Sequence, residues 1–313
     1  MDTGVIIHQM LILFIIMATG YLLNKVHILG PHIDGGITRF IIYCTMPATI
    51  LASVVSREGN NDVRLALLCI IAAACMYIIL PIIAWILARL MRVPKHIRGI
   101  YQFMMIFGNV GFMGFPIIVD VFGEEYLVYC SIFNIFFNLL AFSYGVYLIA
   151  GDEVEGKSGK EDYKFSWKSL LTPGISGAVL ALVLYFLNVS FPDVIAGPIE
   201  SIGSITSPLA MLIIGSTLAN MDLREAFNDI RVYILIAVRF VLLPLAIFPL
   251  LKLVIPDEFV LQLTMFMLVM PVGNMSVLYA KEYGSDESLA AKSIFISTLL
   301  SIVTVPLMVY VCF

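Results

Sequence analysis

Charged side chains are scarce in this sequence: Asp, Glu, Lys and Arg make up 13% of its 313 residues, whereas 61% are hydrophobic. A soluble domain is about half apolar and about a quarter charged. A water-soluble fold of this length would therefore lack the charges needed to cover its surface. The shortage excludes an ordinary soluble domain and favours a chain whose main solvent is lipid.

Motifs of catalysis and metal binding are missing as well. The five cysteines show no CxxC spacing, and the four histidines form no HExxH motif. No Ser–His dyad and no paired aspartates lie within the apolar runs, and no basic patch interleaved with aromatics indicates nucleic acid. The sequence predicts no enzyme, no catalytic residue, no metal site, no cofactor and no nucleic-acid partner.

Long apolar runs dominate what is present. A bilayer crossing takes about 20 mostly apolar residues, and charged residues, Gly or Pro separate ten such runs. The runs cover residues 4–23, 36–56, 65–90, 99–121, 126–150, 169–189, 198–220, 232–254, 259–281 and 288–312. The stretch 151–168 is hydrophilic and is interpreted as a cytoplasmic linker. We therefore predict an all-α, multi-pass integral membrane protein with ten transmembrane helices.

The placement of Lys and Arg predicts an orientation in the membrane. With the N-terminus outside, 14 of these residues lie in loops that face the cytoplasm and three lie in outer loops. Positive charges accumulate on the cytoplasmic side of membrane proteins. The sequence therefore predicts that both termini lie outside, which also requires an even number of spans.

The two halves of the chain share short matches in the same order, at a nearly constant offset of 161 to 164 residues. The matched pairs begin at Tyr21 and Tyr185, Met46 and Ser207, Pro81 and Pro244, Phe122 and Tyr283, and Ser131 and Ser293. Each half has five spans, an odd number, so the second must be inverted in the membrane. We predict two inverted five-helix repeats, residues 1–150 and 169–313, an architecture typical of transporters.

The fourth and ninth runs contain residues that disfavour a continuous helix. The fourth run holds Gly108, Asn109, Gly111, Gly114 and Pro116, and the ninth holds Pro271, Gly273 and Asn274. Proline removes a backbone N–H, and glycine lets the backbone leave the helical region.

Helix breaks of this kind can form a binding site. The N-terminus of a half-helix attracts an anion, and asparagine amides both donate and accept hydrogen bonds. We predict helix breaks at Gly111, Gly114, Pro116 and Pro271, and substrate binding by Gly108, Asn109, Gly273 and Asn274. The alternative is a pair of kinked helices packed through small residues.

Three further polar residues are candidates for the same site. Asn134 and Asn138 are four residues apart and so share one helix face. They either line the site or make interhelical packing bonds. Arg239 lies within a predicted span, where a charge is expensive and marks a functional site by default. It either attracts an anionic substrate or extends toward the cytoplasmic face.

The strings from Gly108 to Pro116 and from Pro271 to Gly284, with the ten-run layout, resemble the auxin efflux carrier family. The similarity is to the bacterial permeases related to plant PIN proteins, and it covers essentially the whole chain. It implies a fold like that of the bile acid–sodium symporters, in which broken spans 4 and 9 cross at the substrate site. By position, Asn109 and Pro116 then belong to the first crossing element, and Pro271 and Asn274 to the second.

The resemblance also implies an assembly and a mechanism. Spans 1, 2, 6 and 7 would form a scaffold, and spans 3–5 and 8–10 a transport domain. An elevator-type movement, a homodimer through the scaffold and a location in the bacterial inner (plasma) membrane are implied as well.

Members of the family handle organic anions: auxin in plants and small carboxylates such as malate in bacteria. The prediction is a secondary transporter of a small organic carboxylate by alternating access, with the lipid bilayer as its surroundings. Two alternatives stay open: a sodium- or proton-coupled symporter of another solute, and a membrane ligand sensor that uses the same pocket.

Overall fold

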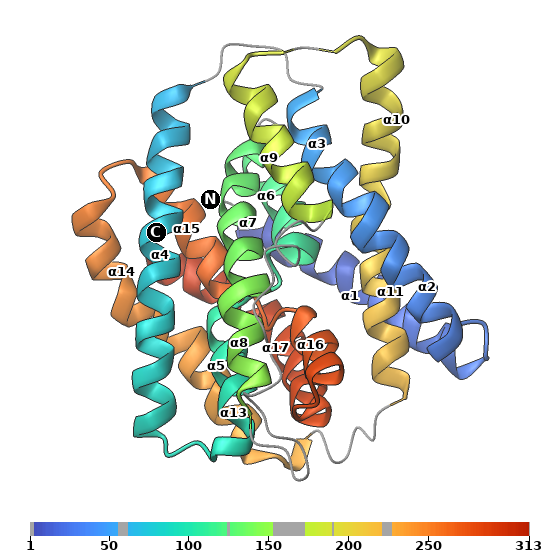
Figure 1. Ribbon diagram of the computed structural model, residues 1–313, viewed down its shortest axis with the longest axis vertical. Coiled ribbons are helices and arrows are strands. Elements are labelled where there is room, and N and C mark those ends of the chain that lie inside the picture. The colour runs from blue at the N-terminus through green and yellow to red at the C-terminus, as the bar shows by residue number, and fades with distance from the viewer. Residues whose placement is uncertain are drawn as a thin grey trace. The chain divides into compact units, whose positions relative to one another are not determined.

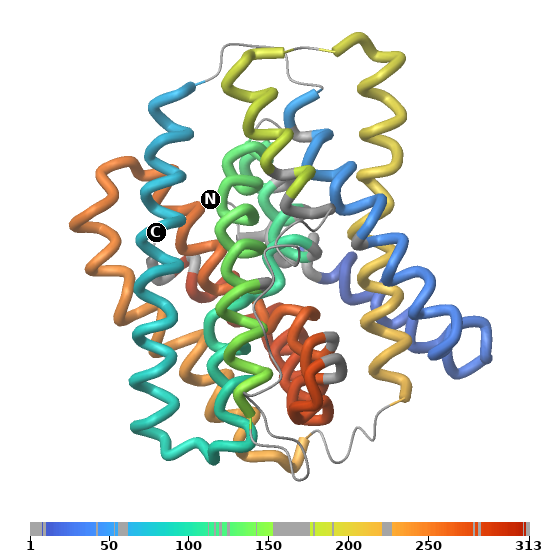
Figure 2. The backbone as a smooth tube through the Cα atoms, viewed as in Figure 1, coloured from blue at the N-terminus to red at the C-terminus, as the bar shows by residue number. Residues whose placement is uncertain are grey.

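The computed structural model describes residues 3–55, 62–123, 126–152, 173–189, 191–220 and 227–312, and this part of the chain is helical without strands (Figures 1 and 2). Within it, six helices are long and apolar enough to cross a membrane. Large apolar side chains, among them Ile15, Ile78 and Leu253, are exposed on the helices. These features confirm the prediction of a helical membrane protein. Exposed apolar side chains are favourable in contact with lipid, and helices satisfy their backbone hydrogen bonds internally, as a bilayer requires.

The helices group into two compact units, each of which draws on both halves of the sequence. Unit 1 consists of Met1–Ile70, Val110–Ile135 and Thr172–Leu223, and unit 2 of Ile71–Asn109, Phe136–Leu171 and Arg224–Phe313. Apart from its first two residues, the predicted linker 151–168 lies outside the described residues.

Unit 1 is a group of helices held together by close backbone contacts. It contains α1 (Thr3–Lys25), α2 (Pro31–Phe40), α3 (Met46–Val55), α6 (Phe115–Phe122), α9 (Pro173–Phe186), α10 (Asp193–Ser204) and α11 (Thr206–Ala219). Helix α1 packs on α11, and α3 lies between α9 and α10 (Figure 1). A Cβ at Gly20 would collide with the carbonyl oxygen of Leu212, and one at Gly215 with that of Met17. Glycine at both positions therefore allows the α1 and α11 backbones to touch.

Helix α2 begins five residues before the apolar run that predicts it. Its first residue is Pro31, whose missing N–H has no helical partner at that position anyway. Asp34 in its first turn is buried, and its Oδ2 accepts from Ser216 Oγ at 2.6 Å. Asn24 Nδ2 donates to the same Ser216 Oγ at 2.8 Å. This polar network lets a carboxylate lie inside the unit, whereas hydropathy alone assigns residues 31–35 to a loop.

Unit 2 contains the interrupted helices. Its elements are most of α4 (Val63–Leu90), α5 (Arg98–Ile106), the end of α7 (Leu127–Leu140), α8 (Val146–Ala150), α13 (Ile230–Ala237), α14 (Leu243–Val254), α15 (Glu258–Val269), α16 (Met275–Tyr283) and α17 (Glu287–Cys312). A π-helical segment, Ala141–Gly145, joins α7 to α8, and another, Val238–Leu242, joins α13 to α14. Such segments widen a helical turn and often occur at functional sites.

The N-terminus of α5 is fixed by a buried carboxylate. Asp152, just after α8, accepts hydrogen bonds from the backbone N–H groups of Gly99 and Ile100 and from Ser285 Oγ. Burial raises the pKa of Asp152 to about 6, although these three hydrogen bonds and His96 favour the ionised form. One side chain thus connects the end of α8, the start of α5 and the turn before α17.

Candidate functional site

Helices α5 and α15 of unit 2 both end in mid-segment, inside the two runs that the sequence predicts to be interrupted. Helix α5 ends at Ile106 and α15 at Val269, and α16 begins only at Met275. Met270, the C-terminal cap residue of α15, is extended, with φ −60° and ψ 143°. Proline at position 271 fits this break, because the residue before a proline is driven out of the helical region.

The extended segments after α5 and α15, residues 107–109 and 271–273, pair with each other, and we call this paired region the crossing. Asn109 N donates to Pro271 O at 2.7 Å, and Gly273 N donates to Phe107 O at 3.1 Å, around an antiparallel bridge between Gly108 and Val272. Backbone groups released by the breaks thus satisfy one another, which is the condition for non-helical backbone at membrane depth.

The paired segments are related by a local two-fold. The two hydrogen bonds are reciprocal, so Asn109 corresponds to Gly273 and Phe107 to Pro271. Each of these pairs is 164 residues apart, within the range of offsets between the sequence halves. The two Gly-Asn pairs are therefore one residue out of register, because Asn109 is equivalent to Gly273 and not to Asn274.

Two serines that sequence reasoning missed support the crossing. Val272 N donates to Ser297 Oγ on α17 at 3.1 Å, and Ser276 Oγ donates to Gly273 O at 2.7 Å. The signal for Ser297 was available, because Ser293, Ser297 and Ser301 recur every four residues in an apolar run. Such a repeat puts hydroxyls on one helix face.

The two predicted site asparagines at the crossing, Asn109 and Asn274, each carry a buried polar atom that the backbone pairing does not use. Within the described part of the chain, Asn109 Nδ2 and Asn274 Oδ1 have no hydrogen-bond partner. Asn109 is 3% exposed, and Asn274 is the N-terminal cap residue of α16. A buried amide group without a partner costs free energy. The crossing therefore offers one donor and one acceptor to a bound molecule, next to the positive end of a helix.

Arg239 contacts the crossing through backbone oxygens. Its side chain is 1% exposed, so it does not extend to the surface. Nε and Nη2 donate to Met270 O at 3.1 and 3.0 Å, and Nη1 donates to Met104 O at 3.0 Å and to Met105 O. The guanidinium thus joins the carboxyl ends of α5 and α15.

An aromatic cluster lies beside the crossing in unit 2. The ring of Phe107 lies 4.6 Å from Phe103, 5.4 Å from Phe137 and 6.5 Å from Tyr77, between centroids. Phe103 also contacts Tyr279 of α16 edge-on at 5.5 Å. These rings give the crossing an apolar wall, of the kind that lines small-molecule sites around a few polar groups.

The other predicted site residues are distributed over both units. Asn138 is buried on the unit 2 part of α7, and Asn134 is buried in unit 1. Gly111 and Gly114 lie in a π-helical segment, Val110–Gly114, and Pro116 lies in α6, all in unit 1. The crossing described above is built from unit 2 residues alone.

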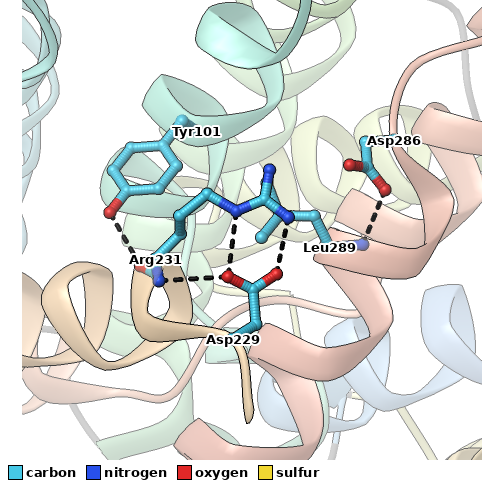
Figure 3. Close-up of polar contacts among 5 residues, drawn as sticks. All are labelled: Tyr101, Asp229, Arg231, Asp286 and Leu289. Carbon is cyan, nitrogen blue, oxygen red and sulfur yellow. Dashed lines mark hydrogen bonds and ion pairs between the residues drawn. The ribbon is translucent and has the colours of Figure 1, made fainter. Parts of the chain in front are cut away.

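One end of α5 is tied to α13 by a further polar cluster (Figure 3). Tyr101 Oη donates to Arg231 O at 2.9 Å, and Arg231 forms an ion pair with Asp229, with Nη2 and Oδ2 2.6 Å apart. Donation from Arg231 holds the pKa of Asp229 below its usual value. Asp286 caps α17 by accepting from Leu289 N at 2.8 Å. This cluster anchors helix ends and stands apart from the crossing.

The described residues hold no group of three or more His, Cys, Asp or Glu side chains that could bind a metal ion. The polar chemistry of the crossing comes from amides, hydroxyls, backbone groups and one guanidinium.

Comparison with known proteins gives one family and two relatives. A family model described as membrane transport protein matches residues 5–309. An uncharacterized transporter of Methanocaldococcus jannaschii is 25% identical over 306 residues, which cover 95% of this chain and 96% of the relative. An uncharacterized transporter of Methanothermobacter thermautotrophicus is 24% identical over 297 residues, which cover 94% of each chain. The family match confirms the resemblance to the auxin efflux carriers.

Proposed function

Because this chain belongs to the membrane transport protein family, we propose that it moves a small organic carboxylate anion across the membrane by alternating access. The substrate class is either auxin-like or a dicarboxylate such as malate. The observation that carries the proposal is the unpartnered amide donor Asn109 Nδ2 at a crossing of two interrupted helices. The unpartnered acceptor Asn274 Oδ1 would take a hydroxyl or N–H of the cargo, not its carboxylate. Unpaired polar atoms in such a buried place are expected to be satisfied by cargo.

The electrostatics of unit 2 favour an anion over a cation at the N-terminus of α16. Helix ends carry roughly half an elementary charge, positive at the N-terminus and negative at the C-terminus. Arg239 neutralises the C-terminal ends of α5 and α15, whereas α16 begins at the crossing without an acidic residue in its first turn. We place the carboxylate against the first N–H groups of α16 and against Asn109 Nδ2.

The proposal includes two inverted repeats, residues 1–150 and 169–313, with ten spans in all. Two observations support it: the reciprocal backbone pairing at an offset of 164 residues, and the packing within unit 1. In the proposed repeats α1 corresponds to α9, and α3 corresponds to α11. The contact of α1 with α11 then has the contact of α9 with α3 as its equivalent, and both contacts are present. Spans 1, 2, 6 and 7 would then form the scaffold of an elevator and the interface of a homodimer, and spans 3–5 and 8–10 its moving domain.

The test is transport by purified protein in proteoliposomes, with labelled malate and a labelled indole carboxylate as probes. Asn109→Ala removes a hydrogen bond to the charged carboxylate, worth about 1.5–3 kcal/mol. Asn274→Ala removes the acceptor for a neutral O–H or N–H of the cargo, worth about 0.5–1.5 kcal/mol. We expect apparent affinity for the transported acid to fall about 10- to 100-fold in Asn109→Ala and about 2- to 10-fold in Asn274→Ala. Asn109→Asp should be worse than Asn109→Ala, because a carboxylate there repels the anion.

Asn220→Ala is the matched control, since Asn220 is an exposed amide at the end of α11. It should transport like the wild type. Normal transport by both Asn109→Ala and Asn274→Ala would show that the carboxylate binds elsewhere. Absence of flux with every tested acid, together with binding detected by thermal shift, would favour the sensor alternative.

A further inference from the structure

The carboxyl ends of α5 and α15 meet around one guanidinium. Met104 O and Met105 O belong to the last turn of α5, and Met270 O caps α15. Four hydrogen bonds from Arg239 reach these three oxygens. An arginine has five N–H donors in a rigid plane, so these bonds use most of its capacity. Its donors are thus committed to backbone oxygens of two different helices.

Three converging carbonyl oxygens are an environment for a cation. Each helix end contributes roughly half a negative charge, so two ends balance one positive charge. Backbone carbonyls at unwound segments and half-helix C-termini are also the groups that coordinate sodium in transporters with broken helices. Left without a cation, these oxygens would be unsatisfied at membrane depth and would repel one another.

Compensation of the charge on Arg239 comes from the backbone. In the part of the chain that the structure describes, no carboxylate lies within ion-pair distance of its guanidinium. A buried charge without any compensation would be very unfavourable. The guanidinium therefore stabilises the two helix ends, and the two helix ends stabilise the buried guanidinium.

The residue at position 108 makes room for this arrangement. A Cβ built on Gly108 would collide with Arg239 Nη2 and would also come within 3.2 Å of Met270 O. Gly108 does not have a positive φ, so left-handed backbone is not the reason for a glycine at this position. Space for the guanidinium explains it instead.

We propose that Arg239 is a tethered cation that occupies a carbonyl-lined cation site between α5 and α15, so that the crossing assembles without a sodium ion there. In this role Arg239 is a positioning residue: it holds the two helix ends together and does not contact the cargo. One consequence, that transport does not require a sodium ion bound at this position, rests on the proposed function. The cation site itself does not depend on what is transported.

The test measures the melting temperature of purified protein in detergent, without any substrate, in NaCl, KCl or choline chloride at equal ionic strength. The wild type should melt at the same temperature in all three salts. Arg239→Ala should melt lower, and sodium or low-millimolar methylguanidinium should raise its melting temperature by several degrees relative to choline. Stabilisation by a ligand of the folded state is the signature of a vacated site.

Arg98→Ala is the matched control, because Arg98 also donates to a backbone oxygen, that of Val93, but lies outside the crossing. It should show no selective response to sodium or methylguanidinium. If Arg239→Ala responds to no small cation, or if Arg239→Met is as stable as the wild type, the proposal is overturned.

A conservative variant keeps the test decisive if Arg239→Ala does not fold. Arg239→Lys retains the charge, so it should fold and its melting temperature should not depend on sodium. Arg239→Met lacks the charge, so it should yield less folded protein. Equal loss of folded protein in both variants would overturn the proposal, since the charge would then make no difference. Because no transport assay enters, these outcomes are independent of the outcome for labelled acids.

Discussion

Ser297 shows how one hydroxyl can hold the crossing in place. It accepts from Val272 N, in the middle of the antiparallel bridge, and it is fully buried. Ser301, one turn further along the same helix and equally buried, donates to Thr298 O. Ser297 also donates within its own helix, to Ile294 O, so the two serines differ in one respect: Ser297 in addition satisfies a backbone donor from another segment.

We expect Ser297→Ala to lower the free energy of unfolding by about 1–3 kcal/mol, because Val272 N is then buried without an acceptor. The measurement is the melting temperature of the purified variant in detergent. Ser301→Ala is the control and should shift the melting temperature much less. Equal shifts in the two variants would contradict the role given to Ser297.

At the scale of one element, the carboxyl of Asp152 at the start of α5 links the stability of the fold to pH. The pKa of this carboxyl is raised from 3.8 to about 6, mainly by burial. The folded protein therefore keeps the proton to a higher pH than the unfolded chain does. By linkage, the stability contributed by this group is fully present below about pH 4 and is lost as the pH rises to about 6.

The expected outcome is a melting temperature that falls between about pH 4 and about pH 6 in the wild type and falls less in Asp152→Asn. Asn220→Ala is the control, since Asn220 is an exposed amide at the end of α11 and has no titratable group. It should keep the wild-type pH dependence. An unchanged pH profile in Asp152→Asn would show that other groups cause the dependence.

At the scale of the whole molecule, the distribution of Lys and Arg predicts which side of the membrane each loop faces. Fourteen against three of these residues favour a cytoplasmic linker and outside termini. Alkaline phosphatase fused to the C-terminus should be active, since it folds outside the cytoplasm, and green fluorescent protein inserted in the linker 151–168 should fluoresce. The reverse pattern would contradict the orientation, and reporters that both indicate the same side would contradict five spans in the second half.

Local features explain why much of the architecture could be predicted from the sequence. Hydropathy identifies lipid as the solvent, because too few charges exist for a water-facing surface. The breaks in 99–121 and 259–281 follow from Pro271 and from glycines whose effect on the backbone is local. In contrast, α2 begins at Pro31 and encloses Asp34 because Ser216, 182 residues away, provides a partner.

By itself, the sequence determined the helical membrane class, the interrupted segments and the list of polar residues within them. Tertiary structure decided which of these residues meet. Arg239 was a candidate because an intramembrane charge is costly, but its partners are carbonyl oxygens at positions 104 and 105, which carry no sequence signal. Every residue has a carbonyl, so only the folded chain shows which ones converge on a charge.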